Sequence, residues 1–122
     1  MSGTWVGVAL PLKEDRRLVA GRGRFIDDLG APGLLHAAML RSPHAHARIV
    51  SIDTQNAEAL PGVIRVVTGA DVAEHAAPLP SFGAGPIVQD LIAIEKVRHY
   101  GEAVAAVIAD DRYIAEDACD LI

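Results

Sequence analysis

The sequence has a single cysteine, few aromatic residues and no long hydrophobic run. Its one thiol, Cys119, cannot form a disulfide within the chain, and a free thiol suits a reducing cytoplasm. The longest purely apolar run, Ala103–Ala109, is far shorter than the roughly 20 residues of a membrane-spanning helix. The N-terminus lacks a basic stretch followed by an apolar core, so it does not resemble a signal peptide. We therefore expect a cytoplasmic protein without a membrane span.

Positive charge is also scarce. The 11 lysines and arginines stand against 16 aspartates and glutamates, which gives a net charge of −5. Proteins that bind nucleic acids or anionic membranes need a basic surface to meet phosphate groups. The balance opposes both roles, and we expect no nucleic-acid partner.

The remaining composition is that of one globular domain. Hydrophobic residues make up 51% of the 122 residues and charged residues 22%, which excludes a disordered or fibrous chain. The length fits a single domain. Strand-like and helix-like patterns occur together along the chain, so the expected fold class is α+β.

Two parts of the chain differ in their patterns. Residues 1–24 form an irregular N-terminal arm with glycines and a charged cluster, and residues 25–122 form the folded domain. Within the domain, alternation and β-branched residues predict strands at 34–41, 47–53, 63–68 and 103–109, with shorter candidates at 92–94 and 97–100. Helices are predicted over 55–60, from 69 and from 112, with a loop over 76–89. Strand 34–41 is mainly apolar on both faces, so we expect it to be central in its sheet.

The last predicted helix has a clear start and no clear end. Asp110 or Asp111 would cap its N-terminus. One face then carries an apolar stripe made of Ile114, Ala118, Leu121 and Ile122. Cys119 lies close to this stripe, so we expect its thiol to be packed. No glycine, asparagine or proline stops the helix, and we expect the domain to be truncated within this element.

Histidines form the first candidate site. His44 and His46 are two residues apart, so on a strand both side chains would point the same way and could share a metal ion, with His36 as a third ligand. Metal sites usually show more ligands at tighter spacing, so the simpler interpretation is a pair of polar residues in the turn after Ser42 and Pro43. A small metal-binding protein stays open as an alternative.

Arginines of the N-terminal arm form the second candidate site: Arg16, Arg17, Arg22 and Arg24. A guanidinium cluster can bind an anion or a phosphate group. However, no Gly-Lys-Ser/Thr sequence follows and no strand precedes, so this is not a phosphate-binding loop. The arginines could instead pair with Asp15, Asp27 and Asp28, or contact a partner subunit. We predict an interface role for them.

Glu102 is the third candidate, because it stands just before the apolar strand 103–109. A carboxylate at the mouth of a strand can act as a general acid or base. This one has no visible partner, so a solvated edge charge is the simpler interpretation. Ser42 and Ser81 lack the sequence context of nucleophilic serines. We therefore assign no catalytic, cofactor-binding or metal-binding residue, which leaves a structural or interaction domain and a piece of a larger enzyme as alternatives.

Several segments together resemble one enzyme family. They are DRRLVAGRGRFIDD at 15–28, PGLLHAA at 32–38, RSPHAHARI at 41–49, IDT at 52–54, LPGV at 60–63, TGAD at 68–71 and KVRHYGEAVA at 96–105. Their order and spacing resemble the N-terminal part of the large, molybdenum-carrying subunit of the xanthine dehydrogenase, aldehyde oxidase and aerobic carbon monoxide dehydrogenase family. The resemblance runs from about Glu14 to Ile122, is weakest at 73–90, and is closest to the three-subunit bacterial members.

The resemblance implies an α/β hammerhead domain, with a mixed sheet, short flanking helices and a protruding β motif. It implies a parent enzyme that oxidises carbon monoxide, aldehydes or N-heterocycles with oxygen from water. That enzyme would use a molybdopterin-type molybdenum cofactor, two [2Fe–2S] clusters and FAD. In the family the cofactor-binding loops and the catalytic glutamate lie beyond this domain, and no position here matches them.

On this interpretation the chain is the N-terminal structural domain of such a large subunit and is inactive alone. Its partners would be the remaining molybdopterin-binding domains and the iron–sulfur and flavin subunits. The alternative is a stand-alone assembly or interaction domain with the same fold. The residues that select a substrate are expected to lie outside this chain.

Overall fold

The fold is that of a computed structural model, which describes residues 7–79 and 89–122. Internal contacts divide the chain into two units, residues 1–33 and 34–122. Most of the loop predicted at 76–89 lies outside the described residues. None of the helices in the described ranges has the length and hydropathy that crossing a membrane requires.

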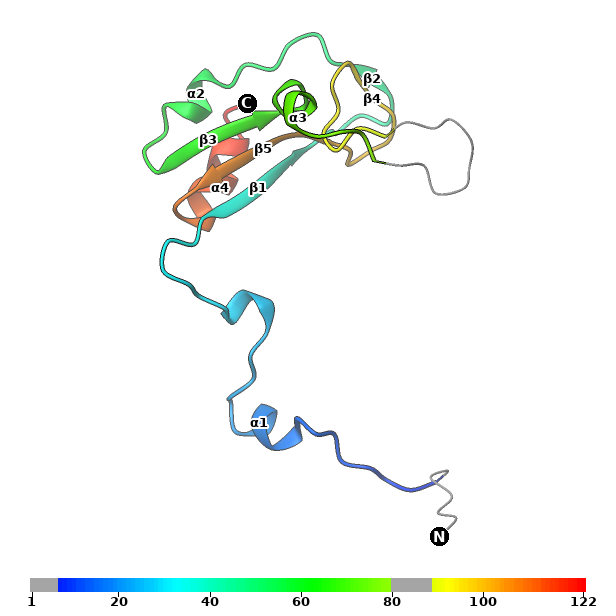
Figure 1. The fold of residues 1–122 in the computed structure, drawn as a ribbon, viewed down its shortest axis with the longest axis vertical. Coiled ribbons are helices and arrows are strands. Elements are labelled where there is room, and N and C mark those ends of the chain that lie inside the picture. Colours follow the sequence, from blue (N-terminus) through cyan, green and yellow to red (C-terminus); the bar gives the residue numbers. More distant parts are fainter. Residues whose placement is uncertain (1–6, 80–88) are drawn as a thin grey trace. The chain divides into compact units, whose positions relative to one another are not determined.

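Strand β5 (Ala103–Ala109) is the centre of the second unit. It pairs antiparallel with β1 (His36–Arg41) on one side and with β3 (Val63–Thr68) on the other, so the strand order is β1–β5–β3 (Figure 1). A second, two-stranded antiparallel sheet joins β2 (Ala47–Arg48) to β4 (Lys96–Val97). The predictions of strands at 63–68 and 103–109 are confirmed to the residue.

Other strand predictions need correction. The sheets are antiparallel where described, not mixed, because β5 runs opposite to both of its neighbours. Strand β1 lies at an edge of its sheet instead of the centre, since β5 takes the central position. The strand predicted at 47–53 is reduced to β2, beyond which the N–H of Ile49 donates to the carbonyl of Glu95 at 2.8 Å. The segment predicted at 92–94 forms no strand, although the N–H of Ala93 donates to the carbonyl of Ala103 at 2.8 Å.

Helices flank the three-stranded sheet on its two faces. Helix α4 (Arg112–Cys119) lies behind it in Figure 1 and contacts all three strands, and α2 (Gln55–Glu58) packs against β3 and α4. Helix α3 (Gly69–His75) lies on the other face, beside the end of β3. The core therefore lies between the sheet and α4. It consists of Ala57, Val66, Ala105, Val107, Ala118 and Cys119.

Small side chains let this core close. Alanines from β5 and α4 are fully buried, so the backbones of strand and helix can approach each other. Val107 is the largest side chain that is completely buried. Its removal from water stabilises the fold by roughly 2 kcal/mol. The α+β class expected from the sequence is confirmed.

Helix α4 begins where the sequence predicts but buries a slightly different face. Its cap is Asp111, whose Oδ1 accepts the N–H of Tyr113 at 2.8 Å and that of Ile114 at 3.4 Å. The buried side chains are Ala115, Ala118 and Cys119, with Ile122 packed at the margin of the core. The predicted stripe is thus wrong at Leu121, which is 42% exposed. The buried set begins at Ala115 and follows the spacing i, i+3, i+4 and i+7, whereas the predicted stripe begins one residue earlier, at Ile114.

The packing predicted for Cys119 is confirmed. Burial raises the pKa of its thiol, and the nearby carboxylates of Asp120 and Glu116 raise it further. Because the thiolate is the reactive form, this cysteine is held in its unreactive state.

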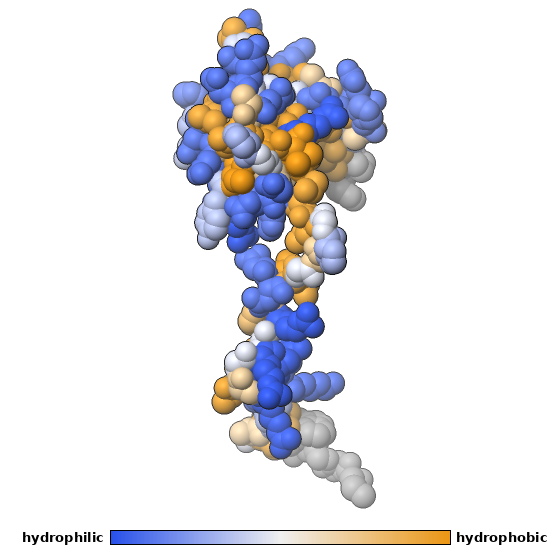
Figure 2. Space-filling view, turned by 90° about the vertical axis from the view of Figure 1, so that its left-hand side faces the viewer, coloured by the Kyte–Doolittle hydropathy of each residue, from blue (hydrophilic) through white to orange (hydrophobic). Residues whose placement is uncertain are grey.

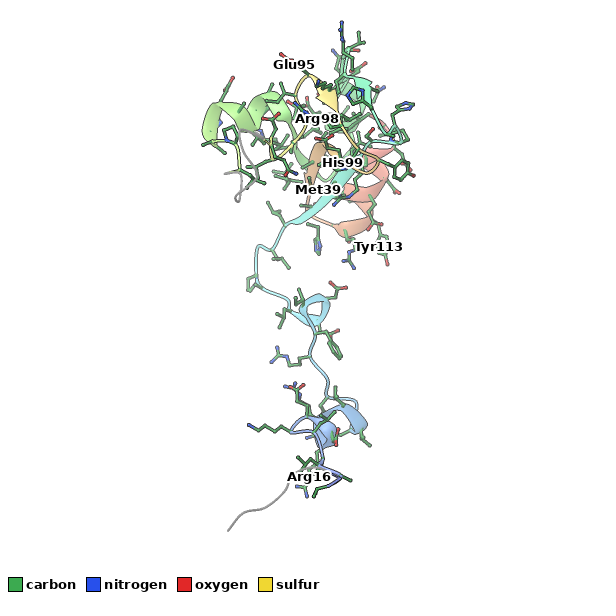
Figure 3. The ribbon with its side chains drawn as sticks, turned by 90° about the vertical axis from the view of Figure 1, so that its right-hand side faces the viewer. Arg16, Met39, Glu95, Arg98, His99 and Tyr113 are labelled. Carbon is green, nitrogen blue, oxygen red and sulfur yellow. The ribbon has the colours of Figure 1, made fainter. Side chains whose placement is uncertain are left out.

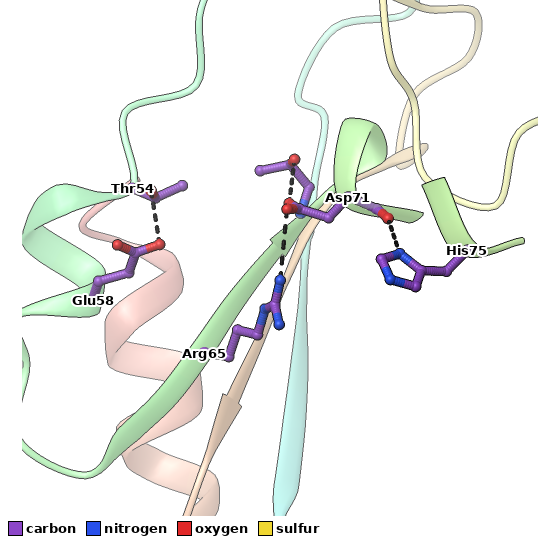
Figure 4. Close-up of polar contacts among 6 residues, drawn as sticks. Thr54, Glu58, Arg65, Asp71 and His75 are labelled. Atoms are coloured by element: carbon purple, nitrogen blue, oxygen red, sulfur yellow. Dashed lines mark hydrogen bonds and ion pairs between the residues drawn. The ribbon is translucent and has the colours of Figure 1, made fainter. Parts of the chain in front are cut away.

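The TGAD segment explains how α3 begins. Oδ2 of Asp71 accepts the N–H of Thr68 at 2.7 Å and its hydroxyl at 2.6 Å, and these bonds lower the pKa of the Asp71 carboxyl. Arg65 and His75 also contact Asp71, through its Oδ1 and its carbonyl oxygen respectively (Figure 4). Gly69 is buried against another backbone, where a Cβ atom would lie 2.4 Å from the carbonyl oxygen of Ala93.

The first unit contains more local order than an irregular arm. Residues 15–19 form α1 (Asp15–Val19), and η1 (Ile26–Asp28) is a single turn of 3₁₀ helix. Neither helix has a buried residue. Val19 and Ile26 are 89% and 86% exposed.

Replacement of Asp111 by alanine should destabilise the domain by about 1 kcal/mol, because two N–H groups of α4 lose their acceptor. Asp110→Ala is the matched control and should change the free energy of unfolding by less than about 0.5 kcal/mol. Urea unfolding followed by circular dichroism measures both. Equal losses for the two variants would contradict the assignment of Asp111 as the cap.

Replacement of Gly69 by alanine should cost about 2 kcal/mol or more, because the new methyl group meets a backbone carbonyl that has no room to move. Gly30→Ala is the control, since a Cβ there meets no atom within 4 Å. Calorimetry should show a clear fall in Tm for the first variant and almost none for the second. A Gly69→Ala protein as stable as the parent would refute the close approach of α3 to Ala93.

Candidate functional site

Two motif segments that lie far apart in the sequence meet at one corner of the second unit. This corner consists of residues 41–46, which run from the last residue of β1, and residues 98–102, which precede β5. The N–H of Ser42 donates to the carbonyl of Glu102 at 2.9 Å, and the N–H of Gly101 donates to the carbonyl of Ser42 at 2.9 Å. The guanidinium of Arg41 donates to the carbonyl of Gly101 at 2.9 Å. The RSPHAHARI and KVRHYGEAVA segments thus form one structure.

Ser42 is buried in the corner, with 5% of its surface exposed. Its Oγ accepts the N–H of His44 at 3.0 Å, and its hydroxyl donates to the His44 carbonyl at 3.1 Å. The Ser42 hydroxyl therefore uses its one donor and one of its acceptor positions within the turn that follows β1. The sequence signal for this role is a serine before a proline, which predicts the turn but not the hydrogen bonds of the Ser42 side chain within it.

Glu102 is buried as well, with 9% of its surface exposed, so the prediction of a solvated edge charge is wrong. Its carboxylate accepts the backbone N–H of Arg98 and lies 3.9 Å from the Arg98 guanidinium. A buried carboxylate needs such partners, because leaving it unpaired would be costly. Figure 3 shows Arg98 and His99 on the loop that leads to β5.

The loop between Arg98 and Glu102 is tight, and Gly101 makes it possible. Its φ of +80° is one that residues with a side chain rarely adopt. The N–H of Glu102 closes the turn on the carbonyl of His99 at 3.3 Å. The side chain of Glu102 therefore folds back on its own loop, where its carboxylate and its backbone N–H both form hydrogen bonds that hold the turn.

The histidines do not come together as a metal site. His44 and His46 lie exposed in the turn between β1 and β2, where a strand's alternation does not apply. His36 is at the opposite end of β1, roughly 17 Å along the strand from Arg41. Across residues 7–79 and 89–122, no group of three or more His, Cys, Asp or Glu side chains is arranged to hold a metal ion.

The arginines predicted as an interface are all exposed in the first unit. Arg16 and Arg17 lie on α1, and Arg22 and Arg24 follow it (Figure 3 labels Arg16). Arg17 forms an ion pair with Glu14, one turn away. The other three have no ion pair within the described part of the chain.

Two carboxylates expected to pair with these arginines have backbone partners. Asp15 accepts the N–H of Leu12 at 2.9 Å, and Asp28 accepts the N–H of Phe25 at 2.9 Å. Both bonds begin short helical turns. These two acidic residues therefore order the first unit locally.

Comparison with known proteins accounts for the motifs. A family model described as "Aldehyde oxidase and xanthine dehydrogenase, a/b hammerhead domain" matches residues 20–122. The nicotine 6-hydroxylase large subunit of Paenarthrobacter nicotinovorans is 42% identical over 121 residues, which are 96% of this chain and 15% of that protein.

Solved structures agree with this match. Quinoline 2-oxidoreductase from Pseudomonas putida 86 superposes with a TM-score of 0.84 and 50% identity, over 94% of this chain and 15% of that one. The Cu,Mo-CO dehydrogenase superposes with a TM-score of 0.83 and 44% identity, over 94% of this chain and 14% of that one. The hammerhead fold expected from the sequence is thereby confirmed.

The chain spans 14–15% of the length of these three proteins. The match nevertheless covers most of the chain and includes both segments of the corner. The chain therefore belongs to the a/b hammerhead domain family of the aldehyde oxidases and xanthine dehydrogenases.

Proposed function

We propose that this chain is the N-terminal structural domain of the large subunit of a molybdenum-containing hydroxylase or dehydrogenase, and that it is inactive alone. The parent enzyme would oxidise carbon monoxide, an aldehyde or an N-heterocycle with oxygen from water. The match of residues 20–122 to the hammerhead family carries this proposal. The small share of each relative that the chain spans supports a role as one part of a larger subunit.

The chemistry of the corner supports a structural role. Ser42 and Glu102 are the two buried polar residues in the described ranges, and both bind to neighbouring backbone. A catalytic carboxylate needs access to a substrate atom. That of Glu102 is almost fully enclosed and closes a turn, which fits a residue that shapes the domain.

We place the molybdenum cofactor in the rest of the large subunit and assign no contact with it to any described residue. Among the described residues, no three His, Cys, Asp or Glu side chains are grouped as metal ligands. The [2Fe–2S] clusters and FAD would belong to partner subunits. We also propose a cytoplasmic location, which the free thiol of Cys119 supports.

Elemental and subunit analysis of the native protein that carries this sequence tests the proposal. We expect molybdenum, iron and flavin in one preparation, with the domain as part of a much longer chain. A native protein that holds none of the three would contradict it. If that protein still bound other subunits, the alternative of a stand-alone assembly or interaction domain would replace it.

The interface role of Arg16, Arg17, Arg22 and Arg24 remains a proposal, supported by four exposed guanidinium groups in a unit where none of the residues 7–33 is buried. Arginines at the centre of an interface commonly carry much of its binding energy.

Reversal of Arg22 and Arg24 to glutamate should reduce co-purification of the parent enzyme's other parts by about fivefold or more. The double reversal of Arg48 and Lys96 is the matched control, because it changes the net charge equally. Those two residues are exposed and face each other across β2 and β4. Unchanged assembly of the Arg22/Arg24 variant, or equal loss in the control, would refute the interface.

A further inference from the structure

The three-stranded sheet has one face that residues 34–79 and 89–122 leave largely uncovered. Two cross-strand rows form this open face. One row is Met39, Ala106 and Val67, and the other is Ala37, Ile108 and Arg65. Five of these six side chains are apolar. Figure 3 shows Met39 on β1, the strand at the edge of the sheet.

Burial differs sharply between the two faces. On the face that α4 covers, Val107 is 0% exposed and Val66 is 4% exposed. On the open face, Met39 is 40% exposed, and Ala106 and Ile108 are only half-buried although they belong to the central strand. In the space-filling view, hydrophobic residues reach the surface of this unit (Figure 2).

The composition of the open face is not that of a solvated surface. An antiparallel sheet with one wet face normally alternates apolar and polar side chains along each strand. Strand β5 is apolar at every position, so both of its faces lack the polar side chains that a solvated face would carry. A contiguous apolar surface of this kind marks a contact with another protein surface.

Helix α3 borders the open face without closing it. It lies beside β3, and a hollow of about 290 Å³ remains between the helix and the strand, lined by Arg65, Val67 and Val72 among others. The side chain of Arg65 is 64% exposed, and its guanidinium is 3.8 Å from Asp71. The open face therefore has an apolar floor and one cationic group at its rim.

We propose that the open face is the docking surface for the rest of the large subunit, so that polypeptide from outside this domain packs on Ala37, Met39, Val67, Ala106 and Ile108. This inference rests on the proposed function. In the relatives, the matched region is only 14–15% of the chain, so several times its mass is present on the same polypeptide.

The chemistry of the face favours such a permanent occupant. Surfaces of permanent contacts resemble a domain core, whereas transient interfaces are more polar. Ala37 and Ala106 leave room for a helix or strand to approach closely, as the alanines of the opposite face do for α4. The occupant would present an apolar face to the sheet.

Photo-crosslinking in the native enzyme identifies the occupant. The variant Ala37→p-benzoylphenylalanine should crosslink to a peptide of the same large subunit that lies outside this domain. Asp117→p-benzoylphenylalanine is the control, because Asp117 lies on the exposed side of α4. Its crosslinked products show what the probe captures away from the open face. A product of the Ala37 variant with residues 1–33, a second copy or another subunit overturns the inference.

Oxidation of Met39 by hydrogen peroxide provides a second measurement that needs no variant. Beneath an occupant, Met39 should oxidise at least about tenfold more slowly in the native enzyme than in the urea-unfolded enzyme. Oxidation within about threefold of the unfolded rate would overturn the inference, because that rate fits a side chain left 40% exposed.

Molybdenum analysis of the same preparation distinguishes failure of the docking surface from failure of the proposed function. Molybdenum together with an exposed Met39 refutes the docking surface and leaves the proposed function intact. Absence of molybdenum from the native protein refutes the proposed function, whichever peptide Ala37 contacts.

Discussion

The fold depends on one alanine-rich strand, β5, which pairs on both edges and packs on one face. Its hydrogen bonds hold β1 on one side and β3 on the other. Strands β1 and β5 are more than half the chain apart in the sequence. Its small side chains allow α4 to approach closely, so a core of alanines, Cys119 and two valines, Val66 and Val107, is sufficient. The corner and α3 both take their positions from the ends of this sheet.

The described side chains of the family's sequence motifs bind mainly to backbone groups of the domain itself. At the corner, Ser42 and Glu102 bind N–H and carbonyl groups of the adjoining loops. At the start of α3, Asp71 accepts the N–H of the N-cap residue Thr68, and Gly69 leaves room for the carbonyl of Ala93. Residues of a motif can therefore be specific to a family without touching a substrate. In the relatives, the matched region is only 14–15% of the polypeptide.

Local signals predicted part of this structure. Strands β3 and β5 are runs of β-branched or small apolar residues between turn signals, and Asp111 is a strong N-cap, so their bounds follow from the sequence. Long-range pairing decided the rest. Strand β1 lies at an edge because β5 pairs with both β1 and β3, which a local sequence pattern does not reveal. Glu102 is buried because its loop makes a tight turn that the positive φ of Gly101 allows. The apolar second face of β1 misled the prediction, because the second unit does not cover it.

We propose that Ser42 and Glu102, the buried polar residues of the described ranges, shape the structure and take no part in the reaction of the parent enzyme. Glu102→Gln in the native enzyme tests it most directly, with Glu95→Gln, an exposed carboxylate, as the control. The measurement is the turnover rate per bound molybdenum, together with the yield of assembled enzyme. The account predicts a lower yield and an unchanged turnover per molybdenum, because Gln weakens the contacts to Arg98. Full assembly with a reduced turnover per molybdenum would contradict it.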